Sequence, residues 1–124
     1  MLVGAIARKC MAKLPETTVK IIFDLQKQLL ERIDDATATE ATIFERYGEI
    51  EETMPELAQL LNIRERATSS YSRLYNLLLR VYESQPLATS AILKLLENSI
   101  EQAEATAAAA RASIQETKRN WNLS

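Results

Sequence analysis

The last third of the chain carries an apolar series that advances by alternating steps of three and four residues without a break. It runs through Leu93, Leu96, Ile100, Ala103, Ala107, Ala110, Ile114, Thr117 and Trp121. Steps of three and four keep every member on one side of an α-helix, and four consecutive heptads favour lengthwise packing at a shallow angle. The spacing therefore predicts a helix over 87–120 that packs along a helix of similar length.

The segment immediately before it supplies such a helix. The same steps recur over 56–84, at Leu60, Ile63, Ala67, Ser70, Leu74, Leu77 and Val81. The turn at Ser84–Pro86, with Ser84 available as a cap, is the only interruption between the two segments. Helices joined by so short a turn are antiparallel neighbours, so we predict a long helical hairpin over 56–120.

Small residues of the two hairpin helices are predicted to face each other. Folding the hairpin about Gln85 brings Ala67 and Ser70 close to Ala103 and Ala107. Alanine at such a contact lets two helix backbones approach to the short end of the usual ~8–10 Å separation. We therefore predict a close-packed seam, which comprises Ala67, Ser70, Ala103, Ala107 and Ala110.

Two further helices are predicted upstream of the hairpin. The first covers 17–36, where apolar residues follow helical spacing before the polar stretch "DDATAT". Thr37 and Glu40 have the form of a capping box that opens a second helix. Pro55, with a second possible capping box at Thr53 and Glu56, predicts a break at 53–55; one kinked, continuous helix is the alternative.

The small number of turn-forming residues predicts the fold class. Two glycines and three prolines in 124 residues leave room for only a few long elements. We expect one all-α domain over 1–124, an antiparallel bundle of four main helices plus a short basic helix over 1–14. That short helix would pack on the bundle or fray, and weak binding to a membrane surface is the alternative.

The residue types that are missing exclude several kinds of chemistry. The chain has no histidine and one cysteine, and its two glycines stand far apart. These absences exclude Ser-His-Asp and Cys-His nucleophile systems, histidine-bearing zinc sites and glycine-rich phosphate loops. We expect no catalytic residues, no cofactor and no metal, with Cys10 buried as a small apolar residue.

The net charge and the number of cysteines predict the kind of partner and the cellular compartment. A net charge of −2 and a pI of about 5.3 give no reason to expect nucleic-acid binding. A single cysteine cannot form a disulfide within the chain, so a reducing, cytoplasmic location is the expectation. Glu45, Glu49 and Glu52 are spaced as a solvated helical face; a cation site or a dock for a basic partner is the alternative.

The helix over 56–84 has more apolar surface than one neighbour can cover, which predicts association. We expect its contact surface at Tyr71, Tyr75, Leu78 and Tyr82, rimmed by Arg73 and Arg80. The function predicted from this pattern is non-catalytic. The chain would serve as an interaction, scaffold or adaptor protein whose partner is another protein or, first, a second copy forming a dimer.

One enzymatic alternative remains open on the sequence. Arg66, Arg73 and Arg80 recur every seven residues, and Glu97 or Glu101 could face them. A helical enzyme or binding protein for an anionic ligand would need these residues in a buried polar cluster. Trp121, near the end of the last helix, is expected to close the hairpin against Leu57 or Met54, with a partner anchor as the alternative.

Overall fold

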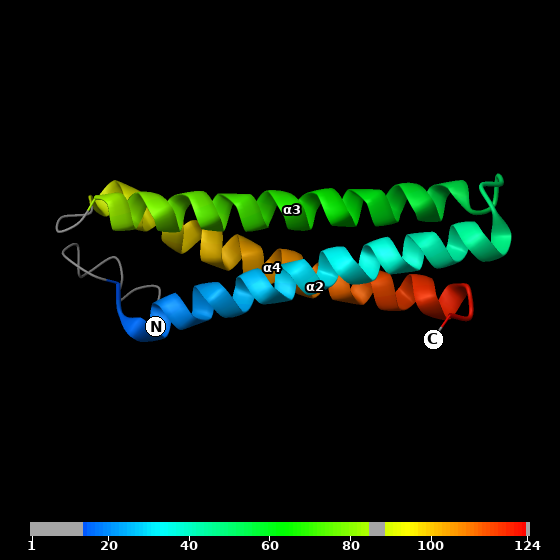
Figure 1. Cartoon of the computed structure of the whole chain (residues 1–124), viewed down its shortest axis with the longest axis horizontal. Helices are drawn as coiled ribbons and strands as arrows, with labels where there is room; N and C mark the ends of the chain where they lie inside the picture. Colours follow the sequence, from blue (N-terminus) through cyan, green and yellow to red (C-terminus); the bar gives the residue numbers. More distant parts are fainter. Residues whose placement is uncertain (1–13, 85–88, 124) are drawn as a thin grey trace.

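The computed structural model describes residues 14–84 and 89–123. Within these residues the chain forms three long helices and no strand: α2 (Glu16–Tyr47), α3 (Met54–Glu83) and α4 (Ser90–Asn120). The helices lie side by side, and α3 runs opposite to α2 and α4 (Figure 1). The predicted all-α class is confirmed. The predicted helix over 1–14, including Cys10, falls outside the described residues except for Leu14.

The prediction of four main helices is wrong because α2 does not stop at the polar stretch. Thr37, Thr39 and Thr42 each donate their hydroxyl to the carbonyl four residues earlier, at distances of 2.7–2.9 Å. These hydroxyls are satisfied within the helix, so Thr37 does not cap a new one. Buried Ala36 and Ile43 carry the apolar contact of α2 through this stretch. The two predicted helices are therefore one helix of 32 residues.

The predicted break at 53–55 is present, although the chemistry of the turn differs from a capping box. Gly48 follows α2 as its C-terminal cap, and its φ of 77° lies in the left-handed region that glycine tolerates. Thr53 is fully buried, accepts a hydrogen bond from the Ile50 amide (3.0 Å) and donates one to the Gly48 carbonyl (2.7 Å). Its hydroxyl thus closes the turn and leaves the first amides of α3 uncapped, while Pro55 occupies the first turn.

Helix α4 begins three residues later than the predicted start at 87. Its cap is Thr89, whose hydroxyl accepts from the Ile92 amide at 3.2 Å. Ser84 instead ends α3 and donates its hydroxyl to the Arg80 carbonyl at 2.7 Å. The rest of the predicted turn, at 85–88, lies outside the described residues.

The core runs along the bundle axis in two clusters of buried residues. The larger cluster joins all three helices and contains Ala67, Ala103 and Ala107 of the seam, which are at most 2% exposed. The smaller cluster lies near the turn between α2 and α3 and contains Ala110 and Ile114. Ser70 is half-buried, 3.4 Å from the Thr106 hydroxyl. The separation of the two backbones along the seam stays a prediction.

Polar contacts tie α2 to α4 on the side away from α3. The Arg32 guanidinium donates through Nε to the Ala107 carbonyl at 3.1 Å. Farther along, the Lys118 ammonium pairs with the Asp35 carboxylate at 2.8 Å. These contacts use side chains on the α4-facing flank of α2, so they leave the α3-facing flank for the surface described next.

Candidate interaction surface

The four residues predicted to form a contact surface do not share one environment. Tyr75 and Tyr82 are each 53% exposed, which leaves their rings available to a partner. Tyr71 is half-buried against the core. Leu78 is only 8% exposed and belongs to the core cluster. Leu78 must therefore be removed from the predicted surface, and Tyr71 contributes only its outer part.

The predicted arginine rim lies on the opposite flank of α3 from the tyrosines. Arg66 lines a hollow between α3 and α4. Leu61, on the same helix, lines a groove between α3 and α2. Heptad spacing keeps Arg73 and Arg80 on the flank of Arg66, and Tyr75 and Tyr82 on the flank of Leu61. The arginines therefore do not border the tyrosine surface.

The structure reveals a larger apolar surface that runs along both α2 and α3. Eight large apolar side chains on these helices are 40–57% exposed. Four of them lie on α3 in a seven-residue series whose central position is Thr68: Met54, Leu61, Tyr75 and Tyr82. Leu79 lies four residues beyond Tyr75. On α2, three follow a heptad that also passes through Thr37. We call this set the α2/α3 stripe: Phe23, Leu30, Phe44, Met54, Leu61, Tyr75, Leu79 and Tyr82.

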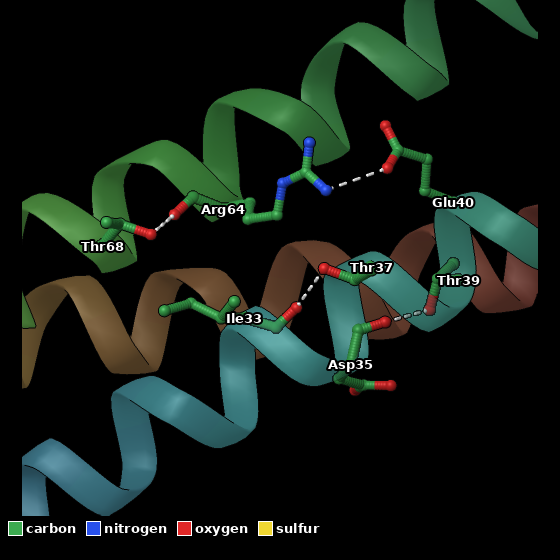
Figure 2. Close-up of polar contacts among 7 residues, drawn as sticks. All are labelled: Ile33, Asp35, Thr37, Thr39, Glu40, Arg64 and Thr68. Carbon is green, nitrogen blue, oxygen red and sulfur yellow. Dashed lines mark hydrogen bonds and ion pairs between the residues drawn. The ribbon is translucent and has the colours of Figure 1, made fainter.

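A polar waist divides the stripe near its middle. Thr37 and Thr68, which interrupt the two heptads, donate their hydroxyls to the carbonyls of Ile33 (2.8 Å) and Arg64 (2.9 Å). Beside them the Arg64 guanidinium pairs with the Glu40 carboxylate across the two helices at 3.3 Å. Figure 2 shows this ion pair bridging α3 and α2 near Thr37, with Thr68 farther along α3. Thr37 lines a groove with Leu61, and Thr68 lines a separate hollow with Ile33, so the two threonines are staggered along the bundle.

The half of the stripe beside the turn is hollow and acidic; we call it the loop-end half. A groove of about 950 Å³ opens there between α2 and α3, and its apolar lining includes Phe44, Met54 and Leu61. Glu45 and Glu49 also line it, and no described basic residue pairs with either carboxylate. The groove therefore combines an apolar lining with two carboxylates that form no ion pair within the described part of the chain.

The opposite half of the stripe is rich in aromatic residues; we call it the far-end half. It carries Phe23, Tyr75 and Tyr82, three aromatic rings that are each more than half exposed. Lys20 and Lys27 are exposed on the same stretch of α2, and neither pairs with a described acidic residue. The two halves of the stripe thus differ in charge, and the groove lined by Glu45 and Glu49 lies in the loop-end half.

The predicted acidic face is only partly assembled. Glu45 and Glu49 line the groove, but α2 ends at Tyr47, so Glu52 lies in the turn and not on a shared helical face. Among the described residues no group of three acidic or cysteine side chains is placed to hold a metal ion. What the acidic stretch provides in this structure is the charge of the loop-end half.

The buried polar cluster required by the enzymatic alternative is not formed by its predicted members. Arg66, Arg73 and Arg80 are all exposed, as is Glu101. Glu97 is buried, but one of its carboxylate oxygens contacts the Lys94 ammonium at 3.4 Å and the other has no hydrogen-bond partner among described groups. The arginines and Glu97 therefore do not form one site.

Trp121 lies where the sequence predicted, against the end of the hairpin, with a neighbour that the sequence did not predict. Like Leu57, it is partly buried and packs against the smaller core cluster. Its ring also lies 5.0 Å from the Tyr47 ring, and the Tyr47 hydroxyl donates to the Trp121 carbonyl at 3.2 Å. Trp121 thereby fastens the end of α4 to the end of α2.

Comparison with known proteins adds no family to this description. The sequence matches no protein-family model, and neither a curated protein nor a solved structure is significantly similar to it. None of the three described helices has an apolar stretch long enough to cross a bilayer.

Proposed function

We propose that this protein is non-catalytic and acts by protein–protein association through the α2/α3 stripe, with a second copy of the chain as its first partner. The stripe supports this proposal because its eight large apolar side chains are concentrated on one pair of helices. Scattered single apolar residues are normal on protein surfaces, whereas a contiguous row along two helices is typical of an interaction site.

The observation that carries the proposal is the heptad order of the exposed residues. Met54, Leu61, Tyr75 and Tyr82 are spaced as the contact positions of packed helices are spaced, yet no other helix of the described chain covers them. Aromatic and methionine side chains are also enriched in protein interfaces. The enzymatic alternative has no comparable support, because its arginines are exposed and none of them forms an ion pair with Glu97.

Sedimentation velocity of the full chain tests self-association. The wild-type protein should sediment as a dimer at tens of micromolar. The double variant Tyr75→Ser, Tyr82→Ser should sediment as a monomer with unchanged helix content, because both rings are more than half exposed and contribute little to the fold.

Leu95→Ser is the matched control. Leu95 is also exposed, but it lies on α4 and outside the stripe, so this variant should remain a dimer. A wild-type chain that stays monomeric at these concentrations would overturn the proposal of self-association. Loss of the dimer in the Leu95 variant would show that a different surface is used.

A further inference from the structure

We infer that the groove in the loop-end half of the stripe binds residues 1–13 of a second copy of the chain. These residues, which we call the N-terminal segment, precede the part of the chain that the structure describes. The inference rests on the proposed function, because it names what covers one half of the surface through which two copies associate. It is supported by the lining and charge of the groove, the composition of the segment and the distance between the two.

The groove has the lining of a site for an amphipathic helix. It lies between two helices, and Phe44, Met54 and Leu61 in its lining are each at least 40% exposed. Ala41 and Ala58 also line it, and their single methyl groups leave room that larger side chains would fill. Apolar grooves between helices bind the apolar face of an amphipathic helix, and methionine adapts its shape to such partners.

The charge of the groove favours a basic occupant. Glu40, Glu45 and Glu49 all line it, and the Arg64 guanidinium pairs with Glu40 at 3.3 Å. Glu45 and Glu49 are exposed and form no ion pair within the described residues. An occupant that carries cations would supply their counter-charges, whereas an acidic occupant would be repelled.

The N-terminal segment has the composition that this groove requires. Its sequence, MLVGAIARKCMAK, contains one arginine, two lysines and no acidic residue. Val3, Ala7 and Met11 recur every four residues, a spacing that places them along one side of a helix. The segment therefore offers an apolar side for the apolar lining and three cations for the two unpaired carboxylates.

The length of the segment also matches the groove. Thirteen residues in helical form span about 20 Å at 1.5 Å per residue. The groove is lined by α2 from Thr37 to Glu45 and by Glu49 in the turn that follows, which is roughly 12–18 Å along the bundle. One helix of this length is therefore sufficient to cover the groove.

The position of the segment favours the groove of a second copy over the groove of its own chain. The segment joins the described chain at Leu14, beside the start of α2, whereas the groove lies at the opposite end of the bundle, beside the α2/α3 turn (Figure 1). Glu45 follows Leu14 by 31 residues, or about 46 Å along a helix. A helix of 13 residues spans less than half of this distance, so it does not reach its own groove.

The exchange of segments is reciprocal. Each copy contributes one segment and one groove, and the same contact therefore occurs twice, which closes a two-fold dimer. The segment does not occupy Tyr75 or Tyr82, so the far-end half stays available for the contact between bundles that their substitution tests.

Charge reversal in two separate chains tests the exchange. The groove variant carries Glu45→Lys and Glu49→Lys, and the segment variant carries Arg8→Glu, Lys9→Glu and Lys13→Glu. In sedimentation velocity each variant alone should dimerise roughly tenfold more weakly than the wild type, because like charges then meet in both grooves. An equimolar mixture should recover the dimer, because the groove of each variant then meets a segment of opposite charge.

The matched control is Glu51→Lys with Glu52→Lys. It makes the same change in net charge as the groove variant, at exposed residues of the α2/α3 turn outside the groove lining, and should dimerise as the wild type does. If the control weakens the dimer as much as the groove variant does, the effect belongs to net charge and the inference is overturned.

The remaining outcomes separate the inference from the proposed function. If both variants dimerise as well as the wild type, self-association stands and the exchange is overturned. If both are weakened and the mixture does not recover, the segments do not lie in each other's grooves. A wild-type chain that is monomeric would overturn both proposals and would assign the groove to a basic helix of a different protein.

The native cysteine distinguishes exchange from folding back within one chain. Cys10 lies in the segment, and Ala58 is an exposed residue of the groove lining. Under mild oxidation Ala58→Cys should give a disulfide-linked dimer on a non-reducing gel, and peptide mapping should join Cys10 to position 58. A disulfide within one monomer would overturn the exchange. Ala109→Cys, at an exposed position of α4 outside the groove, is the control and should form no bond with Cys10.

Discussion

Helix α3 presents two heptad series, one toward α4 and one beside α2. The first series is buried and the second is exposed. On the α4 side, Ala67 is completely buried against the alanines of α4. On the α2 side, Met54, Leu61, Tyr75 and Tyr82 are at least 40% exposed. Both series have the same spacing, so spacing does not decide burial. Alanine lets two helices of one chain close on each other, whereas the large side chains extend beyond what α2 can cover.

This contrast in burial predicts which side chains contribute most to the free energy of unfolding. Leu96→Ala should lower the free energy of unfolding by about 2–5 kcal/mol, because Leu96 is fully buried in the larger core cluster and its loss leaves a cavity. Urea denaturation at one fixed protein concentration measures the change. Leu95→Ala, at the adjacent exposed position, should change it by about 0.5 kcal/mol or less. Equal effects at the two positions would contradict the burial described for α4.

A smaller effect should follow from enlarging the seam. Ala107→Leu should destabilise the protein by about 1–3 kcal/mol, because the added side chain has no room between α3 and α4. Ala105→Leu, on the exposed side of the same helix, is the control and should be nearly neutral. Thermal unfolding of both variants gives the comparison. A neutral or stabilising leucine at position 107 would show that the seam is loosely packed.

The smallest effect concerns the ion pair at the waist. Glu40→Gln should cost about 0.5 kcal/mol of unfolding free energy at low salt, because Arg64 and Glu40 are each about one-third exposed and water screens their attraction. The cost should shrink in high salt. Glu65→Gln, which removes an exposed carboxylate with no described ion pair, controls for the change in net charge. A salt-independent loss would assign Glu40 a packing role instead.

The helix boundaries show which structural features the sequence patterns predict correctly. The 3–4 series correctly predicted α3 and α4 to within three residues, because both helices carry uninterrupted apolar faces. The same reasoning divided α2 at Thr37, since a threonine followed three residues later by a glutamate resembles a cap. A threonine hydroxyl can bond forward to an amide or back to a carbonyl, and only the surrounding packing selects the second.

The surface residues show that sequence patterns do not fully predict which apolar side chains are exposed. Tyr75 and Tyr82 were recognised from the sequence, but Leu78, three residues from Tyr75, was assigned to the surface and is buried. Phe23 and Leu30 were missed because they lie just outside the apolar face predicted for 17–36, and Phe44 was missed in the segment predicted to be a second helix. Their seven-residue spacing was the signal available, and it acquires meaning only when α2 is one helix lying beside α3.

The amino-acid sequence by itself determined that the chain is helical, that 56–120 folds back on itself, and that histidine-dependent chemistry is excluded. Local propensity and short-range periodicity suffice for those conclusions, because each depends on residues close together in the chain or on composition. Tertiary structure decided which apolar residues remain uncovered and that Arg64 of α3 pairs with Glu40 of α2. Those properties depend on how distant helices pack, and a one-dimensional pattern does not contain the relative rotation and stagger of two helices.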